Sequence, residues 1–179
     1  QRLGHSADYW GFACDVSRVR EELEKEDNYM GDSSFRVIIV LSRDGVIAIQ
    51  HQALSPPRRL KIALAGAAVD SADPFLYHKT THRAVYEQQL KARSDCDDVV
   101  LYNKCGELTE CCVGNLVLER DGVRYTPPVG VGLLAGTFRA ELLARGEICE
   151  CVLTIDELAE ADALYLINSV RRWVELDLV

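Results

Sequence analysis

The spacing of apolar and polar positions predicts several separate helices along the chain. They lie at residues 1–12, 15–26, 80–94 and 138–145, with one further short helix after Thr154. The first helix is expected to end near Gly11 and the fourth at Gly146. The expected N-caps are Asp15, Thr80 or Thr81, and Thr137, whose side-chain oxygens can accept a bond from free backbone N–H groups. Thr154 and Glu157 have the spacing of a capping box.

Short β-branched and apolar runs between these helices predict strands. The expected strands are residues 35–41, 46–49, 60–64, 99–102, 116–119, 123–125, 148–153 and 163–167, with one more at the C-terminal end. Asp44-Gly45 and Asp121-Gly122 each separate two of these runs, as in a hairpin turn. Helices interleaved with strands predict a mixed α/β, or α+β, fold.

Two prolines near residue 56 mark an expected domain boundary. Ser55-Pro56-Pro57 is stiff and cannot continue a strand ladder. We therefore expect one domain over residues 1–57 and a larger one over residues 58–179. Gln1 is not an initiator methionine, and residues 1–3 look like the middle of a helix. From this we expect a fragment or a processed product whose N-terminal part is missing.

Composition excludes several classes of protein. The chain has 179 residues, 48% hydrophobic and 27% charged, which is an ordinary globular balance. A net charge of −8 argues against nucleic acid as a partner, because phosphate backbones require basic surfaces. No apolar run approaches the roughly 20 residues of a membrane span, and no signal peptide is recognisable. Seven cysteines without a CxxC pair predict free thiols, no metal site and a cytoplasmic location.

Lys79 is the first candidate for chemistry. It follows the apolar residues 75–77 and precedes a predicted helix. A lysine amine can form a Schiff base with a carbonyl cofactor when burial lowers its pKa and leaves it neutral. A lysine in this position is more often an exposed surface residue, so Lys79 alone does not predict a site.

Three other segments could complete a site around such a lysine. Glu110 follows a predicted strand and could hold a proton on a cofactor ring nitrogen. Gly136-Thr137 opens a helix, where free N–H groups and the helix dipole favour a phosphate. Asn168-Ser169 ends a strand and offers further donors. Each also has a purely structural interpretation. Glu110 could be a turn residue, Gly136-Thr137 a simple N-cap, and Asn168-Ser169 a polar turn.

The order and spacing of these segments together resemble the fold-type IV enzymes that use pyridoxal phosphate, the class IV aminotransferase family. The resemblance covers essentially the whole chain and is strongest from Asp73 to Trp173. Within the family, Lys79 followed by Arg83 four residues later resembles the pattern of 4-amino-4-deoxychorismate lyases. Thr109-Glu110-Cys111-Cys112 followed by Asn115-Leu116 is similar to the same group.

The resemblance implies roles for individual residues. Lys79 would be the Schiff-base lysine, Glu110 the partner of the pyridine nitrogen, and Leu134 a contact on the ring. The remaining cofactor-binding residues would be Arg83, Gly136, Thr137, Phe138, Asn168 and Ser169, most of them near the phosphate. The implied fold has a small N-terminal domain and a larger, barrel-like domain, as in D-amino-acid aminotransferases. In the family, an arginine on the opening strands reaches the phosphate. This chain is expected to begin after those strands, so no residue takes that role.

The implied reaction converts 4-amino-4-deoxychorismate to 4-aminobenzoate and pyruvate, a step of folate synthesis. The family norm is a homodimer, and some members are fused to or associated with aminodeoxychorismate synthase. Two alternatives stay open. One is a branched-chain or D-amino-acid aminotransferase on the same scaffold. The other is a non-catalytic fragment that lacks the phosphate-binding arginine.

Overall fold

The computed structural model describes residues 1–30, 35–56 and 58–179. It divides the chain into two compact units, Gln1–Pro56 and Pro57–Val179. This division falls one residue before the boundary predicted from the prolines. Pro57 itself, part of that predicted boundary, lies outside the described residues.

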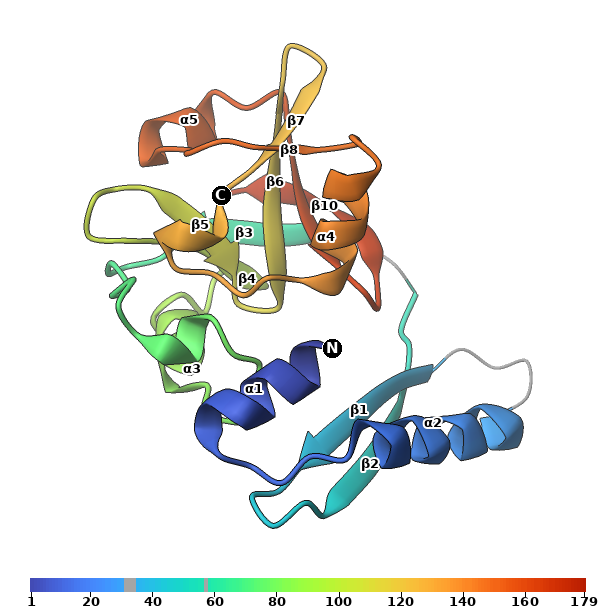
Figure 1. Cartoon of the computed structure of the whole chain (residues 1–179). Helices are drawn as coiled ribbons and strands as arrows, with labels where there is room; N and C mark the ends of the chain where they lie inside the picture. The colour runs from blue at the N-terminus through green and yellow to red at the C-terminus, as the bar shows by residue number, and fades with distance from the viewer. Residues whose placement is uncertain (31–34, 57) are drawn as a thin grey trace. The chain divides into compact units, whose positions relative to one another are not determined.

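The N-terminal unit consists of two helices and a hairpin: α1 (Arg2–Trp10), α2 (Val16–Met30), β1 (Phe35–Leu41) and β2 (Ile47–Ala53) (Figure 1). Helix α1 ends at Gly11, which has the left-handed φ of 66° expected of a helix-terminating glycine. Asp15 caps α2 as predicted, because its Oδ1 accepts the Ser17 and Arg18 N–H groups at 2.9 and 3.1 Å. Helix α2 ends four residues later than predicted.

The hairpin of this unit forms as expected: the first strand has the predicted bounds, and the second is longer than predicted. Strands β1 and β2 are antiparallel, and Leu41 pairs with Ile47 at the turn. Gly45 has a φ of 85°, a conformation that favours glycine. Strand β2 extends to Ala53, although the apolar pattern ends at Ile49.

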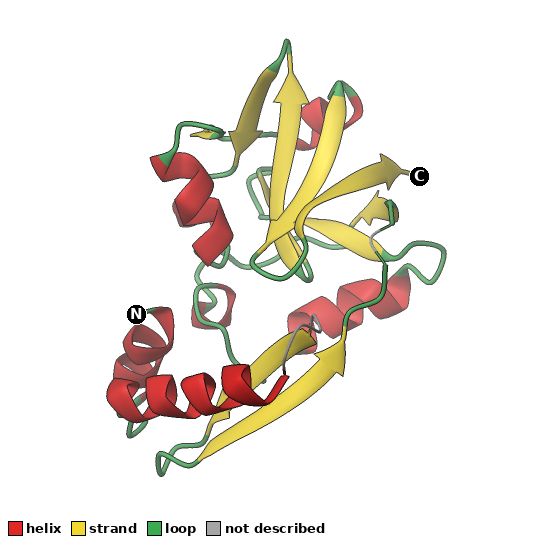
Figure 2. Cartoon of the chain, turned by 90° about the vertical axis from the view of Figure 1, so that its right-hand side faces the viewer, coloured by secondary structure: helices red, strands yellow, loops and turns green. Residues whose placement is uncertain are grey.

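The C-terminal unit contains a closed six-stranded barrel. Its strands are β3 (Leu60–Leu64), β4 (Asp98–Tyr102), β5 (Leu108–Cys111), β6 (Gly114–Arg120), β9 (Ala163–Asn168) and β10 (Arg172–Leu178). They pair in the order β5-β4-β3-β10-β9-β6, and the pairing of β5 with β6 closes the ring. Two short strands, β7 (Val123–Thr126) and β8 (Cys149–Glu150), extend the sheet from β6. Figure 2 shows the strands in yellow. The barrel-like fold implied by the family resemblance is therefore confirmed.

The long connection between β3 and β4 contains a short 3-10 helix, η1 (Pro74–Leu76), and the helix α3 (Ala84–Ala92). The predicted helix over residues 80–94 is too long, and the predicted threonine caps are wrong. Arg83 occupies the N-cap position. The Thr80 hydroxyl instead accepts the His82 N–H at 3.1 Å, so the chain makes a local turn before α3 begins.

Helix α4 (Thr137–Ala144) also begins differently from the prediction. Gly136 is its N-cap, and Thr137 is the first helical residue, so Thr137 is not the cap. The predicted end at Gly146 is confirmed by a φ of 68° there. The strand predicted at residues 148–153 is wrong in length, because only Cys149 and Glu150 pair with β7.

Two local signals in this unit are confirmed. Asp121 and Gly122 have φ values of 52° and 72° between β6 and β7, the twisted two-residue turn expected from this dipeptide. Thr154 and Glu157 form the predicted capping box of α5 (Ile155–Ala159), where Glu157 accepts the Thr154 N–H at 2.8 Å.

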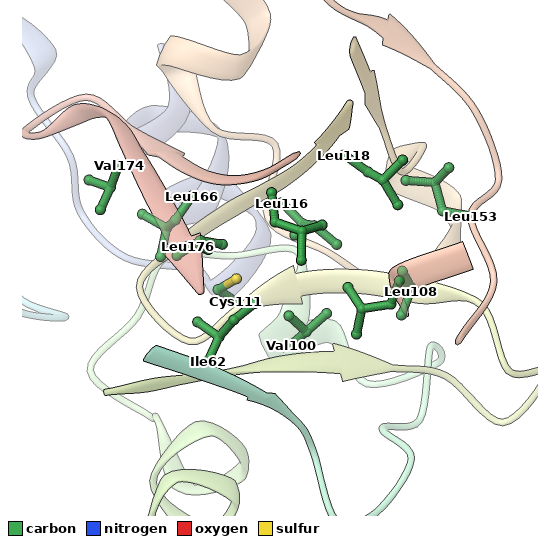
Figure 3. Close-up of a cluster of buried hydrophobic side chains, with 12 residues drawn as sticks. Ile62, Val100, Leu108, Cys111, Leu116, Leu118, Leu153, Leu166, Val174 and Leu176 are labelled. Atoms are coloured by element: carbon green, nitrogen blue, oxygen red, sulfur yellow. The ribbon is translucent and has the colours of Figure 1, made fainter. Parts of the chain in front are cut away.

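The barrel interior is filled by aliphatic side chains (Figure 3). Leu116 and Leu118 of β6 point inward, and Val117 between them packs with Phe138 of α4 on the other face. Val100 of β4 likewise points inward, and Val99 belongs to the cluster beneath α3. This alternation lets one strand serve two cores, because successive side chains point to opposite faces. None of the helices in the described ranges is both long and apolar enough to cross a bilayer.

Candidate functional site

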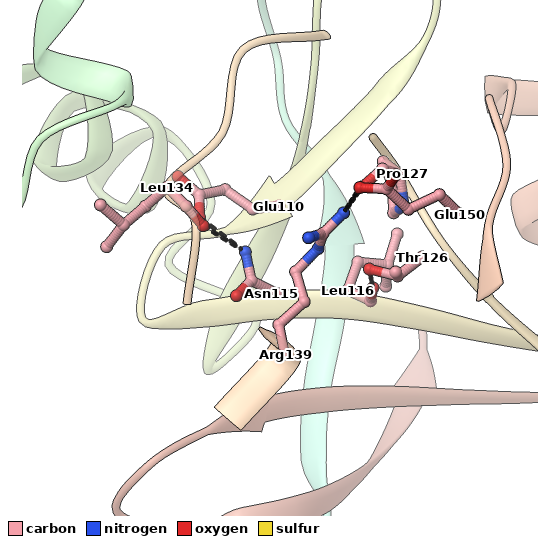
Figure 4. A network of polar contacts seen from close by, with 8 residues as sticks. All are labelled: Glu110, Asn115, Leu116, Thr126, Pro127, Leu134, Arg139 and Glu150. Atoms are coloured by element: carbon pink, nitrogen blue, oxygen red, sulfur yellow. Dashed lines mark hydrogen bonds and ion pairs between the residues drawn. The ribbon is translucent and has the colours of Figure 1, made fainter. Parts of the chain in front are cut away.

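The hairpin of β5 and β6 carries the centre of the candidate site. Glu110 lies within β5, not after it as the sequence suggested, and it pairs with Asn115 of β6. Asn115 is on the same face of β6 as Val117, so it points towards the segment that leads into α4. Its Nδ2 donates to the Leu134 carbonyl at 2.8 Å and lies 3.4 Å from Glu110 Oε2 (Figure 4).

Glu110 is a buried carboxyl group with one short hydrogen bond from a side chain. Its side chain is almost fully enclosed, and the Tyr86 hydroxyl donates to Oε1 at 2.9 Å. Burial raises the pKa of Glu110 to about 8. The Tyr86 hydrogen bond and the nearby positive charges of Lys79 and Arg83 act in the opposite direction. Glu110 is thus poised to ionise when a cationic group approaches.

Arg83 joins helix α3 to the turn of the β5–β6 hairpin. Its guanidinium donates to the Cys112 carbonyl at 2.5 Å and lies 4.6 Å from the centre of the Tyr86 ring. Buried Asp98 supports the same turn by accepting the N–H groups of Cys112 and Val113 at 3.0 and 3.3 Å. The hairpin turn beside Glu110 is therefore fixed from two sides.

The segment before α4 approaches the hairpin closely at Gly136. A Cβ atom at Gly136 would collide with Asn115 Oδ1, so any larger residue there must displace the Asn115 side chain. Gly136 has no side chain with which to cap the helix, and the first-turn N–H groups of α4 are suited to bind an anion. Thr137 is exposed, whereas the Phe138 ring is buried beside Trp173 at a centroid distance of 6.3 Å. Only the backbone of Phe138 can therefore serve a ligand.

Lys79 and the Asn168-Ser169 pair lie at the margins of this arrangement. Lys79 is exposed in the loop between η1 and α3, and its charge acts on Glu110. The Asn168 side chain donates to the Val113 carbonyl at 3.2 Å and accepts the N–H groups of Val170 and Arg171 at 3.0 and 2.8 Å. These bonds commit the Asn168 side chain to the turn after β9. Ser169 is exposed in that turn.

Two residues that the sequence analysis did not place in the site, Tyr86 and Asn115, connect the predicted ones. Their contacts join Arg83, Glu110, Leu134 and Gly136. Tyr86 lies three residues after Arg83, a spacing that places both on one helix face and could have revealed it. Asn115 pairs with Glu110 across a tight turn, a relation visible only once β5 and β6 are known to pair.

A third residue outside the predicted set is Arg139, which anchors α4. Its guanidinium is buried and donates to the Pro127 carbonyl at 2.7 Å (Figure 4). It also forms an ion pair with Glu150 at 2.5 Å. A buried arginine costs energy unless it is paired, so these contacts hold the start of α4 in one position.

Comparison with known proteins assigns the family. The model of amino-transferase class IV matches residues 1–178. A Schizosaccharomyces pombe protein, named as a proposed aminodeoxychorismate lyase, is 30% identical over 96% of this chain and 78% of its own length. A crystal structure of a proposed amino-acid aminotransferase from Mesorhizobium loti has a TM-score of 0.90 and 34% identity, covering 99% of this chain and 88% of that one.

A more distant structure shares the fold. An aminotransferase from Brucella abortus, crystallised with pyridoxal phosphate, has a TM-score of 0.76 at 16% identity, covering 99% of this chain and 73% of that one. The chain therefore belongs to the class IV aminotransferase family and has the fold-type IV architecture. The names of its relatives include both a lyase and aminotransferases, so membership of the family does not select the reaction.

Proposed function

We propose that the chain binds pyridoxal phosphate and acts as a 4-amino-4-deoxychorismate lyase. The observation that carries the cofactor proposal is Glu110: a buried carboxyl group whose Oε1 accepts the Tyr86 hydroxyl and whose Oε2 lies 3.4 Å from Asn115 Nδ2, with the Leu134 backbone as a further contact. A carboxylate oxygen can accept more than one hydrogen bond, so this group can also accept a ring N–H in a short, charge-assisted bond. The close approach at Gly136 and the adjacent start of α4 fit a phosphate group.

Each candidate residue then has a defined task. The N–H groups at the start of α4 and the Thr137 hydroxyl bind the phosphate, together with the turn at Asn168-Ser169. Leu134 packs against the ring, and Glu110 holds a proton at the ring nitrogen. Bound pyridoxal phosphate supplies an electron-withdrawing ring. Lys79 serves as general base and takes the proton from the amine-bearing carbon of the substrate.

Two observations support a lyase over an aminotransferase. Arg83 follows Lys79 by four residues, as in the lyase pattern, and the 30% identical relative from Schizosaccharomyces pombe carries a lyase name. The 34% identical structure from Mesorhizobium loti carries an aminotransferase name, which keeps transamination as the second candidate. The two reactions differ in one requirement, because only transamination needs a keto acid as amino acceptor.

This requirement defines the experiment. We expect the purified chain with pyridoxal phosphate to release pyruvate from 4-amino-4-deoxychorismate without any keto acid. Lys79→Ala is expected to lower the rate about a thousandfold, because it removes the general base. Lys104→Ala is the matched control: Lys104 is exposed and paired with Asp70 at 2.6 Å, so its loss should leave the rate unchanged.

Two results would contradict the proposal. Turnover that appears only when a keto acid is added would replace the lyase with an aminotransferase. If the absorption band of pyridoxal phosphate does not shift to longer wavelength when the wild-type chain is added, the result would favour a non-catalytic fragment. A shifted band in the wild type that is lost in Lys79→Ala would support Lys79 as the reactive amine.

A further inference from the structure

Tyr86 and Glu110 form a buried contact between two distant parts of the C-terminal unit. Tyr86 comes from helix α3 and Glu110 from strand β5, and the Tyr86 Oη to Glu110 Oε1 distance is 2.9 Å. Only 6% of Tyr86 and 4% of Glu110 are exposed, so water cannot readily replace either partner. In such surroundings a hydrogen bond to a carboxylate stabilises the ionised form more than it would at the surface.

The Tyr86 ring is held in place independently of Glu110. It packs in the cluster beneath α3 with Val69, Leu76, Val99 and Leu101. The Arg83 guanidinium lies over its face. Burial raises the pKa of Tyr86 well above its ordinary value, with the neighbouring Glu110 charge adding to the effect. The hydroxyl therefore remains a donor throughout the pH range in which Glu110 titrates.

We propose that Tyr86 is a positioning residue: its hydroxyl fixes Oε1 of Glu110 and leaves Oε2 directed at the cofactor ring nitrogen. The cofactor part of this inference rests on the proposed function, whereas the effect of Tyr86 on Glu110 exists without any ligand. The alternative is that Tyr86 is a core residue with a purely structural role, and that Glu110 only provides the hydrogen-bond acceptor its buried hydroxyl needs. The two differ in whether the hydroxyl controls the ionisation of Glu110.

Other groups around Glu110 also affect its protonation. Lys79 in the loop before α3 and Arg83 at its N-cap both favour the carboxylate. Cys111, the next residue of β5, is buried, and burial raises the pKa of its thiol, so it stays neutral. Cys112 behaves in the same way. Asn115 and the Leu134 backbone are uncharged contacts. Removing the Tyr86 hydroxyl thus changes the hydrogen bonding of Glu110 at Oε1 while leaving these charges in place.

The test compares two tyrosine hydroxyls in the same region. Tyr86→Phe removes the bond to Glu110 and retains the ring. Tyr77→Phe is the matched control, because the Tyr77 hydroxyl donates to the Ser71 carbonyl at 2.7 Å and its ring packs against the same cluster. The pKa of Glu110 is measured in the ligand-free protein from the ¹³C shift of its carboxyl carbon, which Glu110→Gln identifies.

We expect Tyr86→Phe to raise the pKa of Glu110 by about one unit or more, since a hydrogen bond to a charged group has roughly that effect. Tyr77→Phe should leave it unchanged. In the wild type, the ring carbon bearing the Tyr86 hydroxyl should follow the titration of Glu110, and Glu110→Gln should abolish that response. This second measurement needs no substitution of Tyr86, so it decides the matter even if Tyr86→Phe folds poorly.

An unchanged Glu110 titration in Tyr86→Phe, or a Tyr86 carbon that does not respond to Glu110, overturns the proposal. Pyridoxal phosphate affinity is measured separately for the same variants, and we expect about a tenfold loss in Tyr86→Phe only. A shifted titration in a protein that binds no pyridoxal phosphate would sink the proposed function and leave the role of Tyr86 towards Glu110 intact. Normal pyridoxal phosphate binding in Tyr86→Phe, with an unchanged pKa of Glu110, would contradict the role of Tyr86 and leave the proposed function intact.

Discussion

At the scale of single residues, burial of Glu110 disfavours the charged carboxylate that its proposed role requires. A carboxyl group enclosed in protein loses the hydration that favours its charged form, and its pKa rises to about 8. In the folded, ligand-free protein near neutral pH, Glu110 is therefore mostly protonated. A cationic ligand beside the carboxyl group would reverse this, because it adds to the positive charges of Lys79 and Arg83 that already favour ionisation.

The raised pKa predicts a pH dependence of stability. Below about pH 4.5 Glu110 is protonated in both folded and unfolded chains, and it imposes no penalty. Between about pH 4.5 and 8 the unfolded chain releases the proton and the folded chain keeps it, so stability falls as pH rises. From pH 5 to pH 8 this amounts to roughly 3–4 kcal/mol. Glu110→Gln should remove that part of the decrease.

Urea unfolding at pH 5 and pH 8 measures this effect. Other titrating groups contribute equally to wild type and variant, so the difference between the two pH dependences isolates Glu110. A decrease of the same size in Glu110→Gln as in the wild type would show that Glu110 ionises normally in the folded chain.

At the scale of elements, the sequence predicted helix ends and turns correctly where the residue bonds to, or shapes, the nearby backbone. Asp15, the Asp121-Gly122 turn, Gly146 and the Thr154–Glu157 box were all correctly predicted, because each satisfies nearby backbone groups. Thr80 and Thr137 were not the caps. The Thr80 hydroxyl bonds within its own turn, and Gly136 takes the cap position before α4.

The glycine at the start of α4 illustrates what sequence alone could not supply. Gly136 was predicted as part of a phosphate-binding turn, and nothing local indicated that Asn115 would lie against it. We expect Gly136→Ala to destabilise the protein by about 1–3 kcal/mol, because the added methyl group must displace Asn115 from Leu134. Pyridoxal phosphate affinity should fall as well.

Gly130→Ala is the control for that substitution, since a Cβ atom at Gly130 meets nothing within 4 Å. Thermal unfolding and titration with pyridoxal phosphate compare the two variants. Equal effects of both would mean that the loss comes from replacing any glycine in this region and not from the contact with Asn115.

At the scale of the whole molecule, the predictable part was the set of elements and the unpredictable part was their pairing. Strand β3 pairs with β10, more than a hundred residues later, and β6 pairs with β9. Apolar runs do not encode such partners, so the barrel was expected only through the family resemblance. Asn115 could not be predicted for the same reason, because it meets Glu110 only after β5 and β6 have paired.

The closed barrel also predicts that the C-terminal unit folds by itself. Among the described residues, its three hydrophobic clusters are made of residues between Leu60 and Leu176, all inside the unit Pro57–Val179. A chain of residues 58–179 should therefore unfold in a single cooperative transition in urea. Its amide proton signals should be well dispersed in the NMR spectrum. Leu116→Ala within it should cost about 2–5 kcal/mol, because Leu116 is fully buried in the barrel. A gradual transition that Leu116→Ala does not move would show that the barrel depends on residues outside this unit.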